Sequence, residues 1–318
     1  MTRPKVVALG GGHGLAATLR ALTHVDADVT AIVTVADDGG SSGRLRRELE
    51  ILPPGDLRMA LAALAGEDDW AQTWGRLLQH RFPGSGPLGG HAVGNLLLAG
   101  LAETTSGMVE ALDLVGRLVG ARGRVLPASV TPLEIVAEVL GLDPTDPLAT
   151  TRVVGQVAVA TTEGDVCALH LTPEHPPACP EAVQAVLDAD FVVLGPGSWL
   201  TSVITHLLVP ELREALFKTA ATRVVTLNLA PQPGETDGYS PETHLEVLCA
   251  HAPELTVDVV VADEARVLDT RGLMSAVESA GGRLVLAPVS LADGTPRHDP
   301  TRLGAVYAEL LKGNDAWR

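Results

Sequence analysis

The chain has 318 residues, 46% of them hydrophobic, so it is long enough to bury a full core as one large domain or two modest ones. Lys and Arg number 23 against 39 Asp and Glu, and the net charge of -16 argues against nucleic acid or an anionic membrane as the main partner. The three cysteines match no metal-binding spacing, and no apolar run approaches the roughly 20 residues of a membrane span. We therefore expect a cytoplasmic protein without membrane insertion.

Short β-branched runs alternate with longer segments of helical period along the chain. Near-continuous apolar strands separated by helices are typical of a parallel sheet covered on both faces. The predicted fold class is therefore α/β, with a Rossmann-like parallel sheet and helices on both faces. The predicted strands are residues 5–9, 29–35, 191–194, 223–229, 257–263 and 283–289.

The alternation of short apolar strands with helices is interrupted between about residues 66 and 184. Helix-like stretches cover residues 68–82 and 94–120, and two alternating runs at 150–161 and 165–173 are joined through the turn-like TEGD. We expect one Rossmann-like domain over residues 1–318, which carries an inserted helical and β-hairpin lobe at about 66–184.

Glycines follow the first predicted strand, where Gly12, Gly14 and Ala17 fit a G-x-G-x-x-A spacing that opens a helix. Backbone without side chains can approach a phosphate closely, and a helix N-terminus offers free N–H groups. Gly11, Gly12 and Gly14 are therefore candidate ligand-binding residues for a nucleotide or sugar phosphate, with a tight structural turn as the alternative. His13, inside this turn, either contacts the ligand or faces solvent.

The second strand leads into Asp37 and Asp38, followed by Ser41, Ser42 and Arg44. Adjacent carboxylates suit a hard divalent cation such as Mg²⁺ that bridges phosphates, so both aspartates are candidate metal ligands and the other three are candidate ligand contacts. In a dinucleotide-binding fold Asp37 would instead hold a ribose hydroxyl. A solvated turn is the third alternative.

Two later segments carry polar residues at helix starts. Asp56 is placed as an N-cap with Arg58 in the first turn, and capping alone would explain Asp56. His91 and Asn95 are four residues apart and share one helical face if the helix has begun by then. They either line the ligand pocket or form a cap and helix contact.

After residues 191–194 the sequence repeats the pattern of the N-terminal segment, in which an apolar strand is followed by a glycine-rich turn and then by a helix start. Ligands of parallel sheets gather at the carboxyl ends of the strands, so this turn belongs to the same crevice, and two backbone cradles imply a diphosphate-sized ligand. Polar residues after the next strand are candidates to bind sugar or base edges. The candidates in these segments are Gly195, Pro196, Gly197, Ser198, Thr201, Asn228 and Gln232.

Six motifs in this order make the chain resemble the gluconeogenesis factor (YvcK-like) family, part of the CofD or UPF0052-type superfamily of 2-phospho-L-lactate transferases. The resemblance covers about residues 5 to 290 and implies a Rossmann-like core that binds a nucleotide diphospho-sugar, usually UDP-N-acetylglucosamine. It also implies a cytoplasmic role in cell shape and peptidoglycan synthesis during gluconeogenic growth, with no established turnover. The motifs are GGGHGL, TAIVTVADDGGSSGRLR, PPGDLR, GHAVGNLLL, GPGSWLTS and PQPGET.

Carried over motif by motif, the resemblance implies that the first glycines and the turn at 195–198 hold the diphosphate. Asp37 and Asp38 would face the metal or sugar-phosphate region, and His91 with Asn95 would line the pocket. The family commonly has Thr where this chain has His13, and a Thr-Gln pair at residues 230–232. Cell-wall synthesis proteins and a second copy of the chain are the expected protein partners.

Three functions are compatible with these residues. The first is a non-catalytic regulator that senses a UDP-sugar, because the sequence shows no evident nucleophile or acid–base set. The second is a phospholactate-type transferase, in which Mg²⁺ on Asp37 and Asp38 assists attack by a deazaflavin hydroxyl on a diphosphate-linked phosphoryl group. An NAD oxidoreductase rests on the glycine spacing and Asp37 alone. We expect the first.

Overall fold

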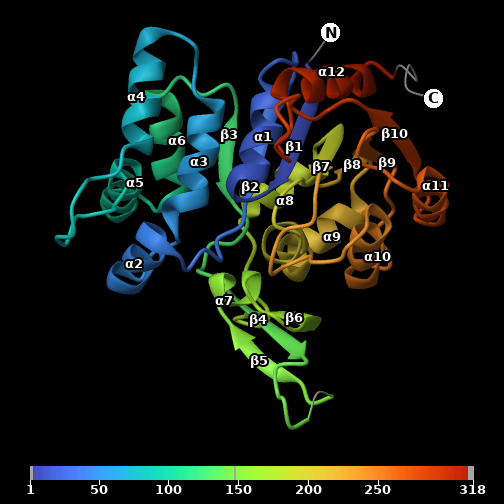
Figure 1. Cartoon of the computed structure of the whole chain (residues 1–318). Helices are drawn as coiled ribbons and strands as arrows, with labels where there is room; N and C mark the ends of the chain where they lie inside the picture. The colour runs from blue at the N-terminus through green and yellow to red at the C-terminus, as the bar shows by residue number, and fades with distance from the viewer. Residues whose placement is uncertain (1–2, 147, 314–318) are drawn as a thin grey trace.

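The computed structural model describes residues 3–146 and 148–313, and the predicted α/β class is confirmed. Figure 1 shows one large sheet surrounded by helices, with a smaller sheet at one end. The large sheet has seven parallel strands in the order β10-β9-β8-β7-β1-β2-β3. Its strands are β1 Lys5–Gly10, β2 Asp28–Val33, β3 Arg124–Pro127, β7 Phe191–Leu194, β8 Thr222–Thr226, β9 Val259–Asp263 and β10 Arg283–Ala287.

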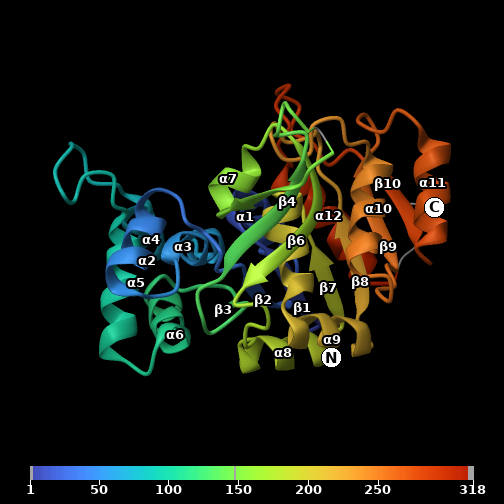
Figure 2. The same cartoon turned by 90° about the horizontal axis from the view of Figure 1, so that it is seen from below.

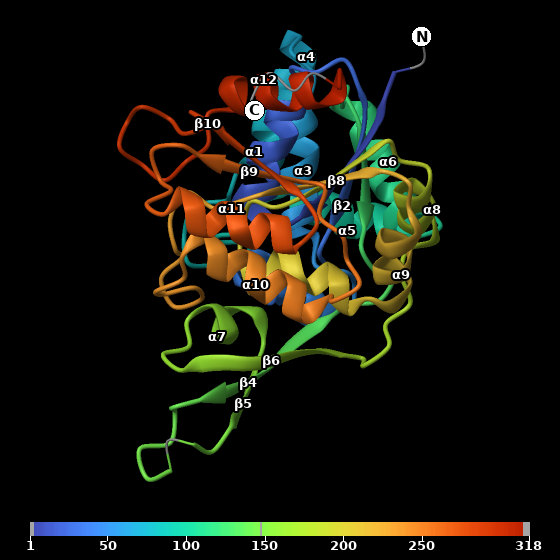
Figure 3. The ribbon, with the colours of Figure 1, turned by 90° about the vertical axis from the view of Figure 1, so that its right-hand side faces the viewer.

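Helices cover both faces of this sheet. Figures 2 and 3 show α1 and α12 on one side of the sheet and α8 and α9 on the other. None of the described helices is long and apolar enough to cross a membrane. The helices are α1 Gly12–Leu22, α2 Gly40–Leu49, α3 Pro54–Leu64, α4 Asp69–Gln79, α5 Val93–Thr104, α6 Met108–Leu118, α7 Gln156–Ala160, α8 Pro180–Leu187, α9 Pro210–Lys218, α10 Pro241–His251, α11 Thr270–Ser279 and α12 Pro300–Leu311, with the π-helix η1 Trp199–Val203 and the 3-10 helix η2 Ile204–Leu208.

The small sheet is antiparallel, in the order β5-β4-β6. Its strands are β4 Glu134–Leu140, β5 Thr151–Val154 and β6 Asp165–Thr172. The predicted hairpin between residues 150–161 and 165–173 is wrong, because β4 lies between these strands and pairs with both of them. The first of the two runs also ends early as a strand, since Gly155 has a φ of 101° and α7 follows it.

The range 66–184, predicted as one inserted lobe, contains elements of three kinds. Helices α4 to α6 come first, β3 then pairs with β2 and extends the main sheet, and the small sheet follows. The predicted helical stretch at 94–120 divides into α5 and α6, because Gly107 adopts a φ of 123° that a continuous helix does not allow. β3 was not predicted, since four residues carry little periodicity.

Candidate functional site

The glycine turn after β1 packs directly against the turn after β7. A Cβ on Gly14 would lie 2.2 Å from the carbonyl oxygen of Pro196 and 2.4 Å from Cα of Gly197, so only glycine permits this approach. Thr18 Oγ1 on α1 donates to the Gly195 carbonyl at 3.1 Å. The two turns that the sequence predicted for one crevice therefore meet at the carboxyl edge of the sheet.

Asn228 holds the second turn in place. Its Nδ2 donates to the Gly197 carbonyl at 2.8 Å, and its Oδ1 accepts the Gly197 N–H at 2.9 Å. Gln232 Oε1 accepts a further, longer bond from Asn228 Nδ2 at 3.4 Å. Both candidate residues thus lie beside the second turn. Both ends of the Asn228 amide are hydrogen-bonded to the backbone of that turn.

A buried carboxylate fills the start of η1. Glu235 Oε1 accepts the N–H groups of Leu200 and Thr201 at 2.9 and 2.8 Å, and the Ser198 hydroxyl donates to the same carboxylate at 2.6 Å. Glu235 is only 7% exposed. The donors that the sequence assigned to a phosphate at Ser198 and Thr201 therefore have an internal anion as their partner.

Asp37 and Asp56 bring two carboxylates together at the ends of β1 and β2. A Cβ on Gly55 would lie 2.7 Å from Asp37 Oδ2, and one on Gly11 would lie 2.6 Å from Asp56 Oδ2. Asp37 Oδ1 accepts the Gly39 N–H at 2.9 Å. Sequence analysis left Asp56 open between cap and site, and the fold places it beside the first glycine turn.

The surroundings of these two carboxylates disfavour their charged forms. Burial, and then the neighbouring charge of Asp37, raise the pKa of Asp56 to about 7, although the Gly12 N–H that it accepts acts in the opposite direction. Burial also raises the pKa of Asp37, against the hydrogen bond from Gly39. A divalent cation would relieve the repulsion, and two carboxylates are a donor set that Mg²⁺ uses.

Two helices begin beside this pair of carboxylates. The first intrahelical bond of α1 runs from Leu15 N–H to the Gly11 carbonyl, and that of α2 from Gly43 N–H to the Gly39 carbonyl. Neither N-cap residue, Gly11 or Gly39, has a side chain to cap its helix, although Asp56 accepts the Gly12 N–H in the first turn of α1. The N–H groups of the first turns, at residues 13–14 and 40–42, therefore lack intrahelical partners and face the carboxyl edge of the sheet.

Asp38 faces a different element. Its Oδ1 accepts the N–H of Val157 in α7 at 3.1 Å, and a Cβ on Gly155 would lie 2.3 Å from its Oδ2. At the other end of α7, a Cβ on Gly234 would lie 2.7 Å from the Ala160 carbonyl oxygen. Asp38 thus holds α7 at the carboxyl edge of the main sheet through the hydrogen bond from Val157. No cluster of three or more His, Cys, Asp or Glu suited to a metal occurs within residues 3–146 and 148–313.

Ser41, His91 and Asn95 meet in a buried polar network. Ser41 Oγ lies 3.0 Å from His91 Nδ1 and accepts Asn95 Nδ2 at 3.0 Å, and Arg58 Nε donates to Asn95 Oδ1 at 2.8 Å. Burial lowers the pKa of His91, so the hydrogen bond between Ser41 and His91 joins two neutral groups near pH 7. All four are less than 5% exposed, which suits a support for α2 better than a nucleophile and its base.

Of the three remaining candidates, Ser42 is buried and its hydroxyl accepts the Gly55 N–H at 2.9 Å, whereas His13 and Arg44 lie nearer the surface. His13 is exposed in the first turn of α1. Arg44 Nη2 donates to the Gly89 carbonyl at 2.8 Å, which ties α2 to the loop before α5. Among the described residues, neither side chain hydrogen-bonds to Asp37 or Asp56, so both stay predicted ligand contacts.

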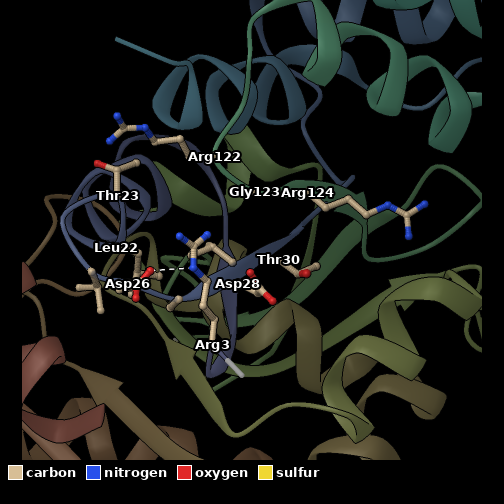
Figure 4. A pocket seen from close by; sticks show the side chains of 12 residues that line it. Arg3, Leu22, Thr23, Asp26, Asp28, Thr30, Arg122, Gly123 and Arg124 are labelled. Carbon is tan, nitrogen blue, oxygen red and sulfur yellow. Dashed lines mark ion pairs between the residues drawn. The ribbon is translucent and has the colours of Figure 1, made fainter. Parts of the chain in front are cut away.

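A cavity of about 630 Å³ lies at the opposite edge, beside the amino ends of β1, β2 and β3. Figure 4 shows Arg3 directed at Asp26, with 2.7 Å between Nε and Oδ1, while Arg122 and Arg124 extend away from this pair. Parallel sheets bind ligands at the carboxyl ends of their strands. The cavity therefore lies at the amino edge of the sheet, opposite the carboxyl edge where the crevice is predicted.

Known proteins resemble the chain over nearly its whole length. A family model described as 2-phospho-L-lactate transferase CofD matches residues 6–280. The putative gluconeogenesis factor of Mycobacterium tuberculosis is 53% identical over 305 residues, which cover 95% of this chain and 88% of that protein. The gluconeogenesis factor of Bacillus subtilis is 35% identical over 325 residues, or 98% and 99% of the two chains.

A solved structure agrees with this relationship. The crystal structure of a UPF0052 family member from Bacillus halodurans superposes with a TM-score of 0.85 at 33% sequence identity. The match covers 96% of this chain and 99% of that protein. Both the sheet and the elements around it are therefore shared with that protein.

Proposed function

Because this chain belongs to the CofD family and its relatives are named gluconeogenesis factors, we propose that it is a cytoplasmic regulator that binds a nucleotide diphospho-sugar. UDP-N-acetylglucosamine is the ligand that we assign to it. Occupancy of the site would be passed on to cell-wall synthesis proteins, and so to cell shape and peptidoglycan synthesis, during growth on gluconeogenic carbon sources.

The observation that carries this proposal is the set of free N–H groups in the first turns of α1 and α2, at residues 13–14 and 40–42, beside Asp37 and Asp56. Free N–H groups at helix N-termini suit phosphate oxygens, and two helix starts at one edge of the sheet would offer them to two phosphates. Asp37 and Asp56 would hold Mg²⁺, which would offset part of the negative charge of the carboxylates and of the diphosphate. Asp38, first expected as the second metal ligand, would act by holding α7 over the edge.

Calorimetric titration of the full chain with UDP-N-acetylglucosamine, UDP, GDP and NAD, each with and without Mg²⁺, tests the proposal. We expect UDP-N-acetylglucosamine to bind most tightly and Mg²⁺ to strengthen its binding. Asp37→Ala should weaken the affinity by at least about tenfold, since it removes one of two charged ligands. Asp28→Ala, which changes an exposed carboxylate at the opposite edge, is the matched control. Binding of GDP but of no UDP species would refute the assignment.

A second candidate function is supported by the family model itself, which describes a phospholactate transferase. In that reaction a deazaflavin hydroxyl would attack the phosphoryl group of a nucleotide diphosphate donor, and the nucleoside monophosphate would leave. Asp37 and Asp56 would then hold Mg²⁺ against the charge that develops on the phosphoryl oxygens. Release of nucleoside monophosphate that depends on added deazaflavin would favour this function over the regulator.

A further inference from the structure

A groove of about 350 Å³ lies between the end of α1, the end of α3 and one side of α4. Arg20, Arg76 and His80 line it together with the amides of Gln72 and Gln79, and no carboxylate among the described residues takes part. The remainder of the lining is Ala and Gly, so small side chains leave room between the polar ones. The volume is that of a site for a small ligand.

The arginines of this groove differ from those of the cavity in Figure 4 in their charge partners. In that cavity Arg3 pairs with Asp26 at 2.7 Å and Arg124 with Asp113 at 2.8 Å. Within residues 3–146 and 148–313, neither Arg20 nor Arg76 has a carboxylate partner, and Arg76 makes one long contact of 3.4 Å with the Thr73 hydroxyl. Two unpaired guanidinium groups in one groove of a chain with a charge of -16 create a local preference for an anion.

The amide of Gln79 is oriented by a partly buried contact. Gln79 Oε1 accepts a hydrogen bond from Arg58 Nη1, and an arginine has only donors to offer, so the amide oxygen must face Arg58. Gln79 Nε2 is then the end left for a ligand, and the described part of the chain supplies it with no acceptor. The groove thus combines two guanidinium groups with an N–H donor fixed in direction.

We propose that this groove binds the phosphate group of a small phosphorylated metabolite through Arg20, Arg76 and Gln79 Nε2. Guanidinium groups match phosphate oxygens in geometry, and hydrogen bonds between charged groups are the strong ones. The site is separate from the crevice, because Asp56 and Ala65 lie at opposite ends of α3, about 13 Å apart along the helix at 1.5 Å per residue. It does not depend on the proposed nucleotide-sugar site.

Calorimetry of the full chain with glucose 1-phosphate and with inorganic phosphate, at an ionic strength held constant with NaCl, tests this site. We expect saturable binding that Arg20→Gln and Arg76→Gln each weaken at least about fivefold. Arg213→Gln, an exposed arginine on α9, should leave it unchanged. Unfolding midpoints equal to that of the unmodified chain would show that the variants fold.

Two results would overturn the proposal. One is the absence of saturable binding for both probes. The other is unchanged affinity in the Arg20 and Arg76 variants, with a loss in Asp37→Ala instead, which would place the phosphate in the crevice. Tighter binding of the ester than of inorganic phosphate supports a metabolite as the ligand, whereas equal binding supports recognition of the phosphate group alone.

Discussion

Asp56→Asn should stabilise the metal-free protein at neutral and alkaline pH. The pKa of Asp56 rises from 3.8 to about 7 on folding, chiefly through burial and then through the charge of Asp37. Since one pKa unit corresponds to about 1.36 kcal/mol, ionising Asp56 in the folded protein costs on the order of 4 kcal/mol. Asparagine is neutral at every pH, and its Oδ1 can still accept the Gly12 N–H.

The sign of the pH dependence follows from proton binding. Between about pH 4 and pH 7 the folded protein holds a proton on Asp56 that the unfolded chain has released, so this group's contribution to stability falls as pH rises through that window. The advantage of the asparagine variant should therefore be small near pH 4.5. It should grow to about 2–4 kcal/mol at pH 8, because solvent at the partly exposed crevice reduces the full value.

Urea unfolding at pH 4.5, 6 and 8, in the presence of EDTA, measures this difference. Asp28→Asn, on an exposed carboxylate at the far edge of the sheet, is the control and should show little pH-dependent change relative to the unmodified chain. Addition of Mg²⁺ at pH 8 should stabilise the unmodified protein and have little effect on Asp56→Asn. A variant that is less stable at pH 8, or a difference that does not vary with pH, would refute the reasoning.

Four further substitutions at three positions test the two turns. Gly14→Ala places a Cβ 2.2 Å from the Pro196 carbonyl oxygen, and urea unfolding should show a loss of about 2 kcal/mol or more; an unchanged midpoint would contradict the close packing. Asn228→Ala removes both bonds to Gly197, so calorimetry should show weaker UDP-N-acetylglucosamine binding, and unchanged affinity would count against this support. Glu235→Ala should destabilise by about 2–4 kcal/mol in urea and Glu235→Gln by less, since glutamine keeps an acceptor; equal losses would disagree.

The parallel sheet could be predicted from the sequence because its strands are buried on both faces. Residues 191–194 form β7 as predicted, and all five residues of β9 are buried, which produces the apolar run that the pattern detects. The small sheet was harder to predict. Strand β5 has exposed and half-buried residues and pairs on one side only, so its own pattern does not indicate which strand lies beside it.

The candidate site was predictable where a motif lies within one strand-to-helix turn, and less so where distant segments meet. Gly14 and Pro196 were expected in one crevice because both follow parallel strands. Asp38 accepts a hydrogen bond from Val157, which is 119 residues away in the sequence. No local sequence pattern connects that aspartate with α7, the short helix between β5 and β6. A pair of adjacent aspartates suggests a shared cation, yet their side chains bond to different elements.

Two carboxylates of the site, Glu235 and Asp56, change how a diphosphate would be placed. Glu235 accepts three hydrogen bonds at the start of η1, so a phosphate there would have to displace a well-bonded internal anion. Asp56 lies beside Asp37 with a raised pKa, so a cation there would offset the repulsion between two neighbouring carboxylates. The free N–H groups in the first turns of α1 and α2 lie beside that pair. This favours a diphosphate bridged by a cation between α1 and α2, with the turn at Gly197 as a wall of the crevice and not as its second phosphate cradle.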